Sequence, residues 1–133
     1  MPAIKHFRDL EVYQAAYKLA LVVHRETGNL KDFALVKEIM RSARSIATNI
    51  AEGFARKSDY KIFNYHLGVA IGEANEMVVH LDFLRDTAGL NGSVSEGLSN
   101  QYEILAKKLN VLRSQNIKRN SPRSKIENLT SNP

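Results

Sequence analysis

Proline is missing from almost the whole of this chain. The three prolines among its 133 residues are Pro2, Pro122 and Pro133, so residues 3–121 contain none. A proline inside a helix removes a backbone donor and clashes with the preceding turn, at a cost of about 3 kcal/mol. The uninterrupted span therefore predicts an all-α protein.

Four stretches repeat their apolar residues at the three- and four-residue steps of an amphipathic helix. The stretches run from about Leu10 to Thr27, from after Asp32 to Arg56 or Lys57, from after Ser58 to Gly89, and from Ser93 to Gln115. The predicted buried stripe of the first helix is Leu10, Tyr13, Tyr17, Leu21 and His24, and that of the second is Val36, Ile39, Ala43, Ile46, Ile50 and Phe54. The stripe of the third is Phe63, Leu67, Ala70, Ala74, Met77, Leu81, Leu84 and Ala88, and that of the fourth is Leu98, Tyr102, Leu105, Leu109 and Leu112. Four such helices joined by short loops predict an antiparallel up-down-up-down four-helix bundle.

Residues at the ends of these stretches predict the helix boundaries. Asp9 is a plausible cap for the first helix, and Gly89 and Gly92 are expected to close the third. Ser93 followed by Glu96 has the spacing of a capping box and predicts the start of the fourth.

The mass of 15.0 kDa fits one domain, which we expect to span residues 1–115. Residues 116–133 hold four basic residues and one acidic residue and so carry +3 of the net charge of +5. They contain few large apolar residues and no periodicity, and this basic tail is predicted to be disordered.

The composition argues against several classes of protein. The chain has no cysteine, no apolar leader and no apolar run of membrane-spanning length, so we expect a cytoplasmic protein without disulfides. Glu73, Glu76 and His80 come closest to a metal-ligand set, but the Glu-x-x-His motif of di-iron bundles is absent. No glycine-rich phosphate loop or nucleophile elbow occurs either, and we predict that the protein is not an enzyme and has no metal or cofactor.

Two groups of cations are candidates for binding nucleic acid. Lys37, Arg41 and Arg44 share one side of the second helix. Arg56, Lys57 and Lys61 lie at the turn that follows this helix. Such groups can bind phosphates, particularly if oligomerisation repeats them, but a solvated or salt-bridged surface explains them equally well.

A second set of residues is predicted to form an oligomer interface. Ser45, Asn49 and Glu52 lie roughly opposite the apolar stripe of the second helix, and Gly68, Gly72 and Glu76 share one face of the third. Each glycine inside a helix costs about 1 kcal/mol relative to alanine, which suggests that another backbone approaches closely. That backbone could belong to a neighbouring subunit or to another helix of the same chain.

The segment EIMRSARSIATNIAEGFAR at residues 38–56 closely resembles the signature of a bacterial family. The family comprises four-helix bundle proteins encoded in intervening sequences of 23S ribosomal RNA genes. FRDLEVYQAA and VAIGEANEMVVHLDFL fit the same pattern, so the resemblance covers roughly residues 7–112. It implies a homopentameric, barrel-like ring and a link to RNA, including accessory proteins of diversity-generating retroelements that partner reverse transcriptases.

The family pattern matches many of the residues already selected by their helical spacing. The matches are Arg41, Ser45, Ile46, Asn49, Ile50, Ala51, Glu52, Gly53, Arg56, Ala70, Gly72 and Glu76. This chain departs from the pattern at Met40, Arg44, Ala47 and Glu73, which changes the distribution of cations on the second helix.

Together these features predict a non-enzymatic, oligomeric RNA-binding or RNA-associated protein. The alternative is a protein–protein scaffold whose basic residues serve only solubility. A metal-dependent oxidase inside the bundle ranks third.

Overall fold

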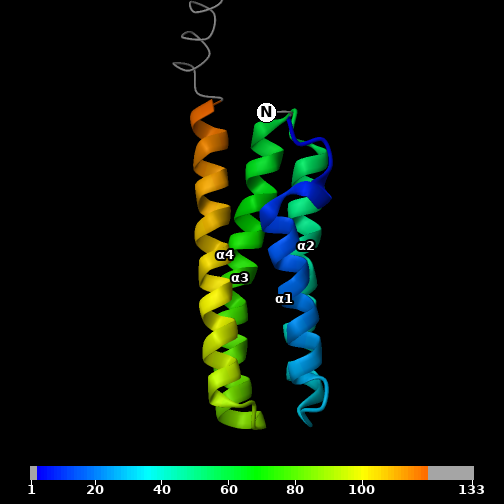
Figure 1. The fold of residues 1–133 in the computed structure, drawn as a ribbon, viewed down its shortest axis with the longest axis vertical. Helices are drawn as coiled ribbons and strands as arrows, with labels where there is room; N and C mark the ends of the chain where they lie inside the picture. Colours follow the sequence, from blue (N-terminus) through cyan, green and yellow to red (C-terminus); the bar gives the residue numbers. More distant parts are fainter. Residues whose placement is uncertain (1–2, 120–133) are drawn as a thin grey trace, which may run out of the picture.

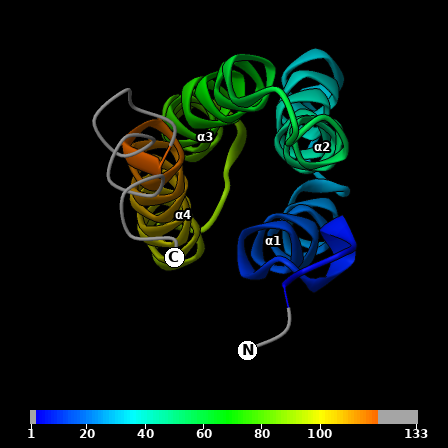
Figure 2. The same cartoon turned by 90° about the horizontal axis from the view of Figure 1, so that it is seen from above.

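The computed structural model describes residues 3–119 of the chain. Its elements are a short 3-10 helix, η1 (Phe7–Asp9), followed by α1 (Glu11–Thr27), α2 (Phe33–Ala55), α3 (Tyr60–Ala88) and α4 (Gly92–Arg119). The helices run alternately up and down (Figure 1) and stand in chain order around a common core when seen from above (Figure 2). The predicted all-α, up-down-up-down four-helix bundle is confirmed.

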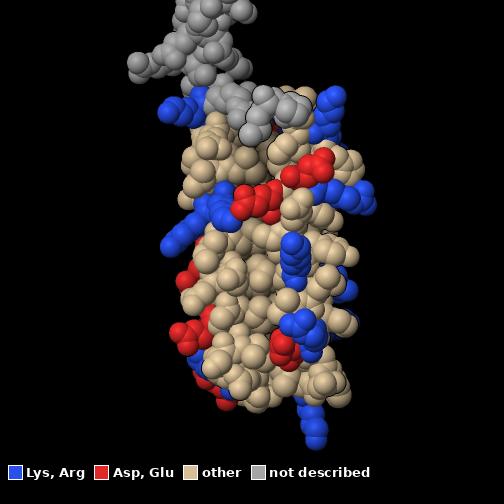
Figure 3. Space-filling model, in the orientation of Figure 1, with Lys and Arg blue, Asp and Glu red and all other residues tan. Residues whose placement is uncertain are grey.

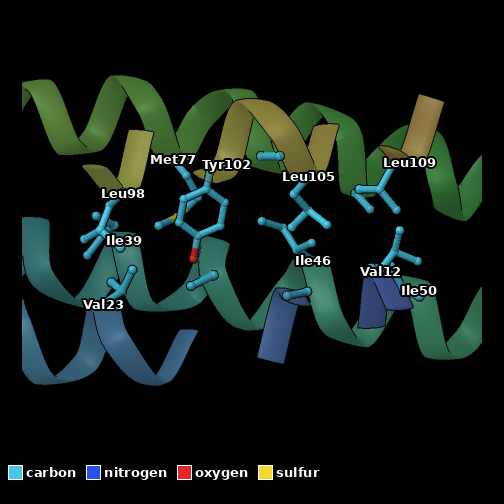
Figure 4. Close-up of a cluster of buried hydrophobic side chains, with 14 of the residues drawn as sticks. Val12, Val23, Ile39, Ile46, Ile50, Met77, Leu98, Tyr102, Leu105 and Leu109 are labelled. Carbon is cyan, nitrogen blue, oxygen red and sulfur yellow. The ribbon is translucent and has the colours of Figure 1, made fainter. Parts of the chain in front are cut away.

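The core follows the stripes predicted for the second, third and fourth helices. All their members are buried except Val36, Ala88 and Leu112, which are partly buried and pack against the core. Figure 4 shows Leu98, Tyr102, Leu105 and Leu109 of α4 facing the apolar side chains of the other helices. In each of these three helices, one continuous apolar stripe therefore determines which face is buried.

The stripe predicted for the first helix is only partly correct, since Leu10 is buried and Tyr13 packs against the core, but its other three residues are exposed. Tyr17 and Leu21 are 51% and 55% exposed, and His24 is exposed as well. The buried positions of α1 are Val12, Ala16, Val23 and Thr27. Apolar residues cover more than one face of this helix, so its three- and four-residue spacing fits two stripes, and the smaller side chains occupy the core. The larger ones remain on the outside.

Two predicted helix caps are also corrected. Asp9 lies in η1, and α1 begins after Leu10 without a side-chain cap. The fourth helix begins at Gly92, because the side-chain oxygen of Asn91 accepts from the backbone N–H groups of Ser93 and Val94 at 2.9 and 3.2 Å. The asparagine side chain thus satisfies two of the free backbone donors in the first turn of α4, and Asn91, not Ser93, is the cap.

The predicted close of the third helix at Gly89 is confirmed. Gly89 has a φ of +81°, a left-handed conformation that glycine adopts without strain. The backbone N–H of Leu90 then donates to the carbonyl of Leu84 at 3.1 Å and leads the chain into α4.

The fourth helix is longer than predicted. It continues past Gln115 to Arg119, and Asn116 is buried within its last turns. The Asn116 amide nitrogen donates to the Asn64 side-chain oxygen at 2.7 Å, which fixes α4 against α3. Residues 116–119 are thus helical rather than tail, and the remainder of the predicted tail, 120–133, lies outside the described residues.

Candidate interaction surfaces

The six predicted cations do not form one patch. Lys37, Arg41 and Arg44 project from the first half of α2, whereas Arg56, Lys57 and Lys61 surround the turn between α2 and α3. At a rise of about 1.5 Å per residue, roughly 28 Å of helix separates Lys37 from Arg56. The set therefore divides into a mid-α2 group and a group at one end of the bundle.

Arg41 is engaged by carboxylates. Its guanidinium donates to Glu38 at 2.7 Å and lies 3.5 Å from Glu73 and 3.8 Å from Glu76, both on α3. The hydrogen bond that Arg41 donates to Glu38 and the charge of Glu73 raise the pKa of Arg41, and the same hydrogen bond lowers the pKa of Glu38. Glu76, predicted for an oligomer interface, thus lies beside a cation of its own subunit.

The other five cations have no acidic partner among the residues that the structure describes. Within residues 3–119, Lys37, Arg44, Arg56, Lys57 and Lys61 form no ion pair. All five are exposed. They are consequently available to an external anion.

Lys57 has a structural contact of a different kind. Its ammonium donates to the carbonyl of Ile4 at 3.0 Å and lies 4.1 Å above the ring of Phe54. This arrangement ties the segment before η1 to the α2–α3 turn and combines a hydrogen bond with a cation–π contact. Cations near the amino terminus are thereby held beside the turn.

Two of the predicted interface residues are hydrogen-bonded within the subunit. The Asn49 amide nitrogen donates to the backbone carbonyl of Ser45 at 2.9 Å and to its hydroxyl at 3.1 Å. The Asn49 amide oxygen lies 2.9 Å from Nδ1 of His66 on α3, and a carboxylate oxygen of Glu52 lies 3.8 Å from the same nitrogen. The structure therefore joins Ser45, Asn49 and Glu52 into a cluster between α2 and α3.

His66 is the member of this cluster that the sequence analysis missed. Asn49 and His66 stand nearly the same number of residues before and after the α2–α3 turn. Residues equally distant from a tight turn lie at the same level in an antiparallel pair of helices, so this symmetry was the available signal.

The glycines of the predicted interface differ in their surroundings. A Cβ at Gly68 would lie 3.7 Å from the guanidinium of Arg113 on α4, so this glycine faces another helix of its own chain. A Cβ at Gly72 would meet nothing within 4 Å. The structure does not bring the two glycines together against one neighbour, and only Gly72 faces open space.

Gly53, part of the family signature, is closely packed against α3. A Cβ at this position would lie 2.9 Å from Cβ of His66 and 3.0 Å from the ring of Phe63. This glycine therefore lets α2 and α3 approach each other at the level of the Asn49–His66 contact.

A groove between α1 and α2 adjoins several of the candidate residues. It has a volume of about 520 Å³ and is lined mainly by apolar and aromatic side chains, with Arg44 and Glu52 at its polar edge. Its lining residues are Phe7, Tyr13, Tyr17, Ala20, Leu21, His24, Met40, Arg44, Ala47, Thr48, Ala51 and Glu52. The exposed side chains of α1 that were predicted for the core thus form one wall of this groove.

A second apolar surface lies on α3. Tyr65, Val79 and Phe83 are 66%, 52% and 56% exposed, and they share the outward side of the helix with Gly72. Large exposed apolar side chains that gather on one face are typical of interaction surfaces.

Neither a metal site nor a membrane span is found in the described part of the chain. No three histidine, aspartate or glutamate side chains of residues 3–119 converge in a way that could hold a metal ion. None of the helices described is both long and apolar enough to cross a bilayer.

Comparison with known proteins identifies similar sequences and structures. A family model described as 23S rRNA-intervening sequence protein matches residues 8–111. A crystal structure of a protein with unknown function from the S23 ribosomal protein family of Bacteroides thetaiotaomicron VPI-5482 is similar, with a TM-score of 0.70 and 26% identity. The similarity covers 77% of this chain and 97% of that one. Comparison with proteins of curated function finds no match.

Proposed function

This chain belongs to the family of 23S rRNA-intervening sequence proteins, and on that premise we propose that it is a non-enzymatic, self-associating protein that binds RNA. The observation that carries the proposal is the set of five exposed cations without a carboxylate partner in the described residues. Cations that are not neutralised within the subunit can replace the counterions of a phosphate backbone.

Self-association is supported by the two apolar surfaces described above. The α1–α2 groove and the exposed face of α3 are different surfaces with no residue in common. Figure 2 shows that α1 and α3 lie on different sides of the bundle. When one surface of a subunit binds a different surface of the next, the contact is heterologous and generates a ring if the rotation closes. We propose a ring of this kind, with the pentamer of the family resemblance as its expected size.

The RNA-binding proposal is tested by titrating a labelled, structured ribosomal RNA fragment with nuclease-treated protein. Fluorescence anisotropy is measured at several salt concentrations between about 50 and 200 mM, with duplex DNA of similar length as the comparator. The expected result is a higher affinity for RNA that falls steeply as salt rises. Absence of RNA binding at the lowest salt would refute the proposal.

A protein–protein scaffold is the second candidate, and the apolar lining of the α1–α2 groove favours it. A groove of this kind suits an apolar helix face from another protein. Such binding depends mainly on apolar burial, so a captured protein partner that stays bound as salt rises, together with no RNA binding, would favour the scaffold.

A further inference from the structure

We propose that the phosphate backbone of RNA binds at one end of the bundle and not along the middle of α2. This inference rests on the proposed function, because it assigns the surface that RNA would contact. The proposed surface, called the basic end below, consists of Lys5, Arg8, Arg56, Lys57, Lys61 and Lys118.

Two contacts bring these distant parts of the sequence together. The Lys57 hydrogen bond to the carbonyl of Ile4 places Lys5 and Arg8 beside the α2–α3 turn. On the other side of the turn, the Asn116 amide nitrogen lies 3.5 Å from the carbonyl of Tyr60. The last turns of α4, which include Lys118, are thereby held next to the start of α3.

The space-filling view agrees with this placement. Figure 3 shows lysine and arginine side chains on both sides of the upper end, where α2 and α4 finish. All six cations of the basic end are exposed, and none forms an ion pair with a described residue.

Few carboxylates oppose this charge. Asp9 and Asp59 belong to the same segments, but one carboxylate oxygen of Asp59 already accepts from the backbone N–H groups of Lys61 and Ile62 at 3.1 and 3.4 Å. Six cations against two carboxylates leave a clear local excess of positive charge.

The middle of α2 is less suited to a polyanion. Its central cation, Arg41, is surrounded by Glu38, Glu73 and Glu76, which would repel a phosphate. Only Lys37 and Arg44 remain there, and Arg44 lines the apolar groove that the proposed function assigns to a neighbouring subunit.

Ring formation would repeat the basic end on one face of the assembly. Cyclic symmetry points every subunit the same way along the ring axis, so the ends that carry these cations lie side by side. The repeated charge raises the local potential and lets one RNA contact several subunits.

The test compares two triple variants that remove the same charge from different surfaces. The end variant is Arg56→Gln/Lys61→Gln/Lys118→Gln, and the matched control is Lys18→Gln/Lys31→Gln/Lys37→Gln. The three control lysines are exposed, form no ion pair with a described residue and lie outside both the basic end and the α1–α2 groove. Lys57 is left unchanged, because it anchors Ile4. Circular dichroism and sedimentation first establish that both variants keep the helix content and mass of the wild-type protein.

Binding of the ribosomal RNA fragment is then measured by anisotropy across the same salt series. Loss of three phosphate contacts should lower the salt slope by about 2 and the affinity near 0.1 M salt by about 100-fold in the end variant. The control should lose less than about 10-fold.

Each alternative outcome overturns a definite part of the proposal. Equal losses in the two variants, or a larger loss in the control, would refute the basic end while leaving RNA binding intact. Equal wild-type affinity for duplex DNA would refute RNA as the specific partner. No wild-type binding to RNA at 50 mM salt would refute the proposed function and the basic end together.

Discussion

The amide oxygen of Asn49 lies 2.9 Å from Nδ1 of His66, and this contact joins α2 to α3. The Asn49 amide nitrogen already donates to Ser45, so its oxygen is the group that faces the imidazole. His66 must therefore carry a proton on Nδ1 to donate this hydrogen bond. The signature segment thus has a structural role within the subunit.

Replacing Asn49 by alanine should destabilise the bundle. The change removes the hydrogen bond from a half-buried imidazole, and we expect the free energy of unfolding to fall by about 1–2 kcal/mol. Urea denaturation at one fixed protein concentration measures the effect. The matched control is Thr48→Ala, since the Thr48 hydroxyl donates to the carbonyl of Arg44 in its own helix and to no other described residue. Equal stability of the two variants would show that the contact between the helices contributes nothing.

Gly53→Ala should also lower stability, although alanine is the better helix former. Its Cβ would lie 2.9 Å from Cβ of His66, so α2 and α3 would have to separate. We expect a loss of about 1–3 kcal/mol from this overpacking. Gly97→Ala in α4 is the control, because its Cβ would meet no described atom within 4 Å and the position lies outside both apolar surfaces, and a gain of up to about 1 kcal/mol is expected from helix propensity. A stabilised Gly53→Ala protein would contradict the close-packing explanation.

The fold was predictable because three helices have a single apolar stripe. In α3, Phe63, Leu67 and Ala70 fit only one face, and this face is the buried one. In α1, Tyr17 and Leu21 also fit a helical stripe, and spacing alone could not tell a core from an exposed apolar groove. That choice depends on which face the other three helices cover, which is a property of the whole bundle.

The candidate surfaces were only partly predictable for a similar reason. Helical spacing gives the direction of a side chain but not its partner on another helix. Arg41 shares a side of α2 with Lys37, yet its partner Glu73 lies 32 residues further along the chain. The basic end likewise combines Lys5 with Lys118, which no local pattern connects.

Charged substitutions on the two apolar surfaces should prevent self-association. Leu21→Glu places a carboxylate in the α1–α2 groove, and Phe83→Glu places one on the exposed face of α3. Burying an unpaired charge at an interface is unfavourable, so we expect each variant to have a lower mass by sedimentation or light scattering.

Ile104→Glu is the control for these variants. Ile104 is exposed on α4, outside both proposed surfaces, and its substitution should leave the mass unchanged. A monomeric wild-type protein would refute self-association. If Ile104→Glu were monomeric while Leu21→Glu and Phe83→Glu kept the mass of the wild-type oligomer, the interface would lie on α4 instead.

Tyr102→Phe should preserve or increase stability at neutral pH. Tyr102 is fully buried, and its hydroxyl has no hydrogen-bond partner among the described residues. Removing an unpaired buried hydroxyl relieves a desolvation cost of about 1–3 kcal/mol, while the ring keeps its packing (Figure 4).

The same substitution should alter the response of the bundle to alkaline pH. Burial raises the pKa of Tyr102 above its ordinary value of 10.0, so this phenol ionises more readily in the unfolded chain than in the folded one. Below pH 10 the phenol is neutral in both states and adds no pH dependence, whereas above pH 10 the free energy of unfolding falls as the unfolded chain ionises, by up to about 1.4 kcal/mol per pH unit. Urea denaturation of wild type and Tyr102→Phe between about pH 8 and 11.5 measures the difference. The wild-type free energy of unfolding should fall more steeply above pH 10, whereas parallel curves would mean that water reaches the hydroxyl in the folded bundle.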